Sequence, residues 1–301
     1  MIAIGRAAAQ SRGKAAPVRQ TLQGQKRLFS VSTASGNADG NGTALSPRWL
    51  ADLRSRIEAC LAANPQGEER TRLEKHLECV DSNWLELSAG REGFLTDKRW
   101  RGLDKFAVAW GDMLPTNLDD QGHVNNIMYN RYAESGRVNW VTSFAAHAPP
   151  EERQQWVDVM SPRGVGLILR SIKTDYKLVS VCARHRRVER KAAMLTGAIA
   201  QPVAYPDKIT VIHKLAQRPT YSSDSIFLDA VIYSEMHKRV AARCFEDIVA
   251  YDYRAGKRAT LKGFMVDELQ KTYDLQEKTR KQVDRKVCEL ERDMKVMEDE
   301  A

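Results

Sequence analysis

The chain has 301 residues, of which 43% are apolar and 29% charged, and its net charge is +8. A globular chain of this length buries enough surface to fold without disulfides or a structural metal, and the sequence holds no stretch of about 18 uncharged apolar residues that would predict a membrane span. Most of the positive charge lies in residues 1–38, which contain no acid. The remaining chain is close to neutral, so we expect no nucleic-acid partner.

The five cysteines are widely spaced, odd in number and without a CxxC pair. This pattern is typical of a reducing compartment and predicts neither a disulfide framework nor a zinc site. We expect ordinary thiols at Cys60, Cys79, Cys182, Cys244 and Cys288.

Residues 1–30 are basic, free of acids and rich in Ala, Ser and Gln, which is the composition of a mitochondrial transit peptide. The run Arg27-Leu28-Phe29-Ser30 resembles a mitochondrial processing site. We therefore expect the protein in the mitochondrial matrix; the alternative is a basic tail without a targeting role. Residues 31–47 are rich in Ser, Gly, Asn and Thr and predict a flexible linker.

Residues 48–99 predict a helical extension. Apolar residues recur there at steps of three and four in two stretches, the first after Ser46-Pro47 and the second ending at Gly90. We expect these two amphipathic helices to cover part of a larger core through Trp49, Leu50, Leu53, Ile57, Cys60 and Leu61, and through Leu73, Leu77, Val80, Trp84 and Leu87.

In residues 100–265 the apolar residues first follow the period of one long helix and then that of several strands, which predicts an α+β domain. A helix over Ile127–Phe144 carries large apolar groups on most sides, which favours a buried position. In the strand Gly166–Tyr176, we expect Leu167 and Leu169 on one face and Ile168 and Ile172 on the other. The other predicted strands cover Asp104–Trp110, Ile209–Ala216, Ser225–Ser234 and Val240–Tyr253.

Residues 266–301 predict a polar C-terminal helix with a short heptad seam. Gln276 and Arg280 interrupt the seam upstream. We expect this helix to lie on its own or a partner's domain rather than form a free coiled coil, with Val283, Val287, Leu290, Met294 and Met297 turned inward.

The segment before the buried helix carries the chemistry. Asp119 and His123 lie just upstream of Asn125-Asn126, and Asn is a strong helix cap. The free amides and the dipole at a helix start favour negative charge nearby. A carboxylate, an imidazole and aimed N–H groups are the parts needed to attack an acyl carbonyl and hold its oxyanion.

The stretch from Trp110-Gly111-Asp112 through Asp119 to Arg137 resembles the motif of hotdog-fold thioesterases of the 4-hydroxybenzoyl-CoA thioesterase type, and most of all a fungal mitochondrial thioesterase-like group. Lys173–Lys177 and Pro206–Ile209 resemble later pieces of the same pattern.

The resemblance implies an antiparallel sheet wrapped round a long central helix. It also implies a homodimer or higher homo-oligomer with active sites at the interface, an acyl-CoA or acyl-carrier thioester as substrate, and neither a metal nor a redox cofactor. Asp119 matches the family's nucleophile or base, with His123 beside it, and the amide of Asn126 would be the oxyanion donor. The substrate-binding candidates are Asn125, Tyr129 and Glu134.

Each of these residues also has a structural interpretation. Asp119 could cap the helix, His123 could fix the loop, and Tyr129 could belong to the core. Glu134 lies three residues before Arg137 on one helix face, which favours a structural pair or a dimer contact.

Two insertions depart from the family pattern. Residues 114–118 directly precede Asp119, and residues 179–201 interrupt an otherwise continuous match. The second insertion begins with Val-Ser and ends with Gln. Codons for these residues can contain the donor and acceptor sequences of an intron. We interpret 179–201 as an aberrant insertion that translates a retained or unspliced intron.

Two other functions compete with thioester hydrolysis. The helical flanks and the insertion beside Asp119 favour a non-catalytic hotdog subunit of a mitochondrial complex such as the ribosome. An enoyl-CoA hydratase or dehydratase is the third candidate, because hotdog hydratases also pair Asp with His.

Overall fold

The computed structural model describes residues 46, 48–63, 65–112, 124–177 and 206–300. The chain divides into Met1–Ser46 and Pro47–Ala301, and all of the described helices and strands belong to the second unit. The predicted transit peptide, nearly all of the linker, and the insertion 179–201 lie outside the described residues.

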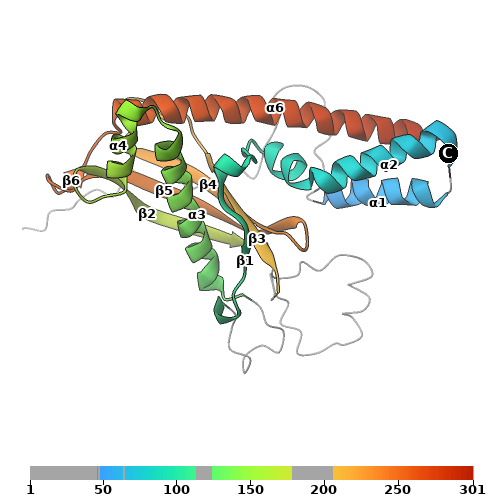
Figure 1. Cartoon of the computed structure of the whole chain (residues 1–301), viewed down its shortest axis with the longest axis horizontal. Helices are drawn as coiled ribbons and strands as arrows, with labels where there is room; N and C mark the ends of the chain where they lie inside the picture. Colours follow the sequence, from blue (N-terminus) through green and yellow to red (C-terminus); the bar gives the residue numbers. More distant parts are fainter. Residues whose placement is uncertain (1–45, 47, 64, 113–123, 178–205, 301) are drawn as a thin grey trace, which may run out of the picture. The chain divides into compact units, whose positions relative to one another are not determined.

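One antiparallel sheet forms the centre of the domain, in the order β1-β3-β4-β5-β2, with the short β6 paired to β5. Helix α3 (Asn126–His147) packs across it against β1, β3, β4 and β5 (Figure 1). This arrangement confirms the α+β hotdog fold. The strands are β1 (Arg101–Ala107), β2 (Val165–Tyr176), β3 (Lys208–Leu215), β4 (Ser225–Ser234), β5 (Arg239–Asp252) and β6 (Lys257–Arg258).

The sheet buries both of its faces because apolar side chains alternate along the central strands. Val211 and Ile232 pack in a core with the first turns of α3, whereas Ile212 and Val231 belong to a second core on the opposite face. The short helical turn η1 (Glu86–Gly90) and its neighbours cover that opposite face.

Strand β1 begins and ends three residues before the predicted Asp104–Trp110 strand. Its pairing with β3 shifts between Leu103 and Phe106, and Lys105 between them has φ 49°. The strand stops because the Asp112 carboxylate accepts the Ala109 N–H and turns the chain into the one-turn helix η3 (Trp110–Asp112).

The expected alternation along β2 is wrong in its second half. Leu169 pairs with Ile248 and Ser171 with Asp247, so one extra residue, Arg170, bulges between them. The bulge reverses the parity, and Leu167 and Leu169 therefore share the α3 face with Ile172, Thr174 and Tyr176, opposite Ala250, Ile248, Glu246, Cys244 and Ala242 respectively.

Helix α4 (Pro150–Val159) was not expected from periodicity. Its Trp156 stacks on Phe144 of α3 with ring centroids 4.8 Å apart. Pro150 at the first helical position, followed by two acids, is a helix-start signal that the sequence carries.

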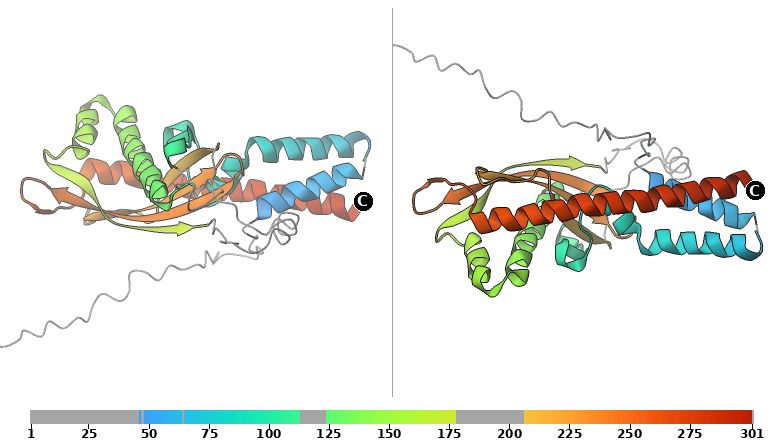
Figure 2. Two further views of the ribbon diagram at one scale, coloured as in Figure 1. Left: turned by 90° about the horizontal axis from the view of Figure 1, so that it is seen from below. Right: turned by 90° about the horizontal axis from the view of Figure 1, so that it is seen from above.

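The N-terminal helices and the C-terminal helix form a three-helix unit, as Figure 2 shows. Helices α1 (Trp49–Ala62) and α2 (Gly67–Ser82) lie beside the second half of α6 (Gly263–Glu300), and Arg56 of α1 binds Glu291 and Glu298 of α6. The heptad seam is buried, with Met294 fully enclosed. The expectation that the last helix lies on its own domain is confirmed.

The outer face of α3 is exposed in this chain, although the apolar groups on most sides of the helix favoured a buried position. Ile127 is 72% exposed and Val138 39% exposed within this chain. Among the helices of the described residues, none combines the length and hydropathy that crossing a bilayer requires.

Candidate active site

The amides at the start of α3 are almost all occupied. Asn125 caps the helix, its Oδ1 accepting the Ile127 N–H at 3.0 Å and its carbonyl accepting the Met128 N–H at 2.9 Å. The Asn125 N–H itself donates to the Asp112 carbonyl at 2.9 Å. The Asn126 N–H, in contrast to those of Ile127 and Met128, has no acceptor among the described residues.

Asp112 accepts three hydrogen bonds that anchor the start of α3. Its carbonyl accepts the Asn125 N–H, and its Oδ2 accepts the Ala109 N–H at 3.1 Å and the Tyr132 hydroxyl at 2.7 Å. Sequence reasoning treated Asp112 only as the start of a motif. A Gly-Asp pair a few residues after a strand is a turn signal, and Gly111-Asp112 could have predicted this anchoring role.

Tyr176, at the end of β2, reaches the same helix end. Its hydroxyl donates to the Asn126 carbonyl at 3.1 Å, and its ring lies edge-on to Tyr129 at 5.5 Å. One turn further along, the Thr174 hydroxyl donates to Oδ1 of Asn130 at 2.5 Å. These two bonds fix the start of α3 over β2.

Four aromatic rings run in a row beneath the first turns of α3, and we call them the aromatic wall. The centroids of Phe106 and Tyr132 are 6.2 Å apart, those of Tyr132 and Tyr129 6.4 Å, and those of Tyr129 and Tyr176 5.5 Å. Tyr129 and Tyr132 are each only 3% exposed. Burial, with the bond to Asp112 second, raises the pKa of Tyr132, which keeps its hydroxyl protonated.

The structure brings together only part of the predicted site. Asn125, Asn126 and Tyr129 meet at the start of α3, whereas Asp119 and His123 lie outside the described residues. Glu134 lies on the exposed face of α3. The expected pairing partner of Glu134 points elsewhere, because Arg137 Nη1 donates to Oε1 of Glu246 at 2.6 Å.

Glu246 belongs to a buried charged cluster that sequence reasoning missed. It lies on β5, with Arg137 from α3 on one side and His213 from β3 on the other, 3.7 Å from Oε2. Burial raises the pKa of Glu246 to about 7, against the opposing effect of Arg137. Burial, with Arg137 second, lowers the pKa of His213 to about 3, so this histidine is neutral.

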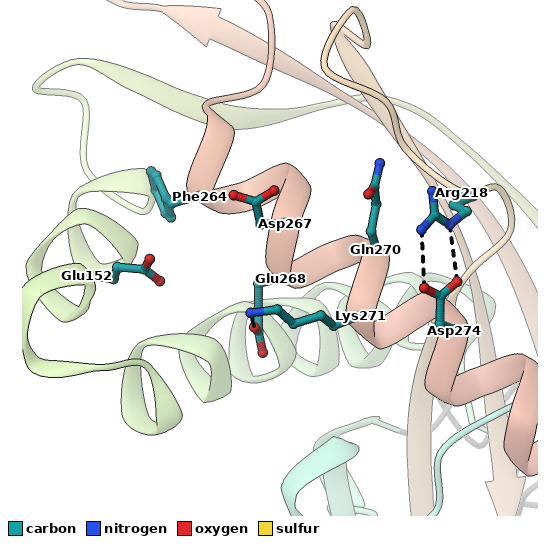
Figure 3. A pocket seen from close by; sticks show the side chains of 8 residues that line it. All are labelled: Glu152, Arg218, Phe264, Asp267, Glu268, Gln270, Lys271 and Asp274. Carbon is teal, nitrogen blue, oxygen red and sulfur yellow. Dashed lines mark hydrogen bonds and ion pairs between the residues drawn. The ribbon is translucent and has the colours of Figure 1, made fainter.

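A hollow of about 360 Å³ lies on the outside of α6, away from the start of α3 (Figure 3). Four of its charged side chains form pairs, Arg218 with Asp274 and Lys271 with Glu268. Within the described part of the chain, no three His, Cys, Asp or Glu side chains gather to hold a metal ion. The candidate site therefore remains the helix start.

A backbone N–H aimed from the positive end of a 22-residue helix can stabilise an oxygen that gains negative charge. Hydrogen bonds fix the residues around this N–H. The Asp112 carbonyl accepts the Asn125 N–H, Asn125 Oδ1 accepts the Ile127 N–H, and the Tyr176 hydroxyl donates to the Asn126 carbonyl. Such a preorganised donor suits addition to a carbonyl group.

The profile of the thioesterase-like superfamily matches residues 113–277, which is more than half of the chain. A comparison with curated proteins gave no match.

Solved structures resemble the chain at low identity. A thioesterase of Thermus thermophilus, crystallised with coenzyme A and zinc, is 17% identical with a TM-score of 0.38, covering 61% of this chain and 98% of that one. YbaW of Escherichia coli is 20% identical with a TM-score of 0.36, covering 56% and 96%. The PA2801 protein of Pseudomonas aeruginosa is 18% identical with a TM-score of 0.36, covering 55% and 94%.

Proposed function

The chain belongs to the thioesterase-like superfamily, and on this premise we propose that it hydrolyses an acyl-CoA or acyl-carrier thioester. The observation that carries the proposal is the Asn126 N–H, left without an acceptor among the described residues at the start of α3. A thioester carbonyl placed there would have its developing oxyanion stabilised by the amide and the helix dipole.

In the proposed reaction, a water oxygen bonds to the acyl carbon and the carbon–sulfur bond breaks. The products are a carboxylate and a thiol. Asp119 acts as the base for this water or as the nucleophile itself, and His123 positions the substrate or shares the proton transfer. Asn125 and Tyr129 shape the site beside Asn126, and no metal or redox cofactor takes part.

We further propose a homodimer. The outer edge of β2 has no strand beside it in the described chain, and the neighbouring face of α3 exposes Ile127 and Val138. Exposed apolar side chains on a helix beside a free strand edge favour pairing with a second copy. Glu134 lies on the same helix face and would then be at the interface.

The location in the mitochondrial matrix is likewise a proposal, and it rests on the composition of residues 1–30. Import into isolated mitochondria, with sequencing of the mature N-terminus, tests it. Retention of residues 1–30 after import would contradict a cleaved transit peptide.

Asp119→Asn tests the activity directly. A positioned base typically contributes ~10²–10⁴-fold, so we expect turnover of a panel of acyl-CoA thioesters to fall by about that range. The matched control is Asp97→Asn, at an exposed carboxylate on the other side of β1 in the sequence. Unchanged hydrolysis in Asp119→Asn would exclude the assignment.

A non-catalytic subunit remains the second candidate. The three-helix unit favours it, because the proposed reaction uses no residue of that unit. Hydrolysis of none of the acyl-CoA thioesters, together with stable co-purification in a large particle, would decide for it. Hydration of an enoyl-CoA in the same assays would decide for a hydratase.

A further inference from the structure

We propose that the site takes short acyl groups and that Tyr132 is the residue that sets the limit. This inference rests on the proposed function and names the substrate class of that same site. It is argued from the aromatic wall (Phe106, Tyr132, Tyr129 and Tyr176) and from the bond between Tyr132 and Asp112.

The aromatic wall lies directly inward of the Asn126 amide. Side chains of an α-helix point back toward its N-terminus, so the ring of Tyr129 covers the turn that carries Asn126 and the ring of Tyr132 covers the turn after it. The hydroxyl contacts agree, because Tyr132 reaches Asp112 before the helix and Tyr176, in contact with Tyr129, reaches the Asn126 carbonyl. A carbonyl held at Asn126 would have its acyl group facing these rings.

The rings leave little room between the helix and the sheet. Tyr132 is six residues from Asn126, about 9 Å along the helix axis. Tyr129, Tyr132 and Val124 are each 3% exposed, so solvent hardly reaches the space between them. Behind them, Val211 and Ile232 from the sheet close the same core. A long acyl chain could enter only by displacing a ring.

Tyr132 is the ring that resists displacement most. Its hydroxyl donates to a carboxylate at 2.7 Å, and a bond to a charged acceptor is stronger than one between neutral groups. The same carboxylate accepts the Ala109 N–H, and the Asp112 carbonyl accepts the Asn125 N–H, so Asp112 cannot follow a moving ring without loosening the helix start. Phe106 is 45% exposed at the end of the wall and has no such bond.

The outer face of α3 offers an acyl group much less contact. Ile127 is 72% exposed there within one chain, and in the proposed homodimer the second copy would occupy this face. The apolar surroundings that a short acyl group needs are therefore those of the aromatic wall.

The test is a chain-length series from acetyl-CoA to hexadecanoyl-CoA, measured as kcat/KM with the full-length protein. We expect butanoyl-CoA to exceed hexadecanoyl-CoA by about tenfold or more, since a single methylene in a closed pocket changes selectivity by about 10–200-fold. Tyr132→Ala should lower that preference by at least about tenfold, and Tyr132→Phe, which keeps the ring but loses the bond, should lower it by less.

Phe106→Ala removes an exposed ring of the same wall and supplies a second variant should Tyr132→Ala fail to fold. Tyr251→Phe, at a ring on β5 that packs on Tyr253 away from α3, is the control and should keep the wild-type profile. Equal or better hydrolysis of hexadecanoyl-CoA by the wild type would overturn the inference. So would an unchanged profile in every folded variant of Tyr132 and Phe106. Absence of hydrolysis for all chain lengths would instead refute the proposed function.

Discussion

Gly102 of β1 and Gly136 of α3 touch backbone to backbone. A Cβ at Gly102 would lie 2.3 Å from the Gly136 carbonyl oxygen, and one at Gly136 would lie 2.8 Å from a methyl group of Val211. Asn139 strengthens the crossing by donating from Nδ2 to the Gly102 carbonyl at 2.7 Å. The two glycines thus allow the central helix to lie on the sheet at this distance.

Gly102→Ala should therefore force the helix and the strand apart. Because the collision is with backbone, which cannot rotate away, we expect a loss of about 3 kcal/mol or more in the free energy of unfolding. Denaturant unfolding measures it. Gly164→Ala, where a Cβ meets nothing within 4 Å, is the control and should change stability little. Equal stability of the two variants would contradict the crossing.

The buried cluster around Glu246 should make stability depend on pH. Its pKa is raised to about 7 in the folded chain from an ordinary 4.5, so ionisation costs folding free energy as the pH rises from 4.5 to 7, by up to about 3 kcal/mol. Glu246→Gln mimics the protonated form and should lose this dependence. The pKa of His213 is lowered to about 3 in the folded chain from an ordinary 6.5. The free energy of unfolding therefore falls as the pH is lowered from 6.5 to 3, in the wild type and in Glu246→Gln alike.

The difference in unfolding free energy between wild type and Glu246→Gln therefore isolates the glutamate. We expect it to move in favour of the variant as the pH is raised from 4.5 to 7, measured by urea unfolding at several pH values. A difference that stays constant over this range would show that folding leaves the pKa of Glu246 at its ordinary value.

The heptad seam should contribute to the stability of the three-helix unit. Met294 is fully buried, and truncating such a side chain costs about 2–5 kcal/mol. Met294→Ala should lower the free energy of unfolding by that order. Val296→Ala, at a side chain 45% exposed two residues away, should cost well under 1 kcal/mol. Similar losses in both variants would mean that the seam is not packed in solution.

The proposed homodimer can be tested on the outer face of α3. A charge at Val138 would sit at the interface, so Val138→Glu should shift the mass measured by light scattering from dimer to monomer. Val157→Glu replaces a residue 49% exposed on α4 and should leave the mass unchanged. A monomeric wild type would refute the dimer.

Periodicity predicted the regular elements well and their irregularities badly. The strand Ser225–Ser234 was predicted to the residue, because its mostly apolar run is bounded at both ends by polar turns. In β2 the same reasoning assigned the wrong face after Leu169, since a bulge adds one residue without any mark in the sequence. Whether Leu169 shares a face with Ile172 is decided by pairing with β5 and not by β2 itself.

The candidate site also contains residues whose role could be predicted from the sequence and residues whose role could not. Asn125 as a helix cap followed from residue type alone, and the structure confirms it. Glu246 and His213 could not be connected to Arg137 from sequence, because three elements far apart in the chain bring them together. Asp119 and His123 stay predictions from the motif.

The pairing of α1 with the end of α6 has a consequence for biosynthesis. Arg56 and Glu298 are 242 residues apart, so α1 finds its partner only when almost the entire chain has been translated. Until then Leu53 and Ile57 have no α6 to shield them, and contacts this distant slow folding. Newly made chains should therefore depend on chaperones longer than the sheet alone would require.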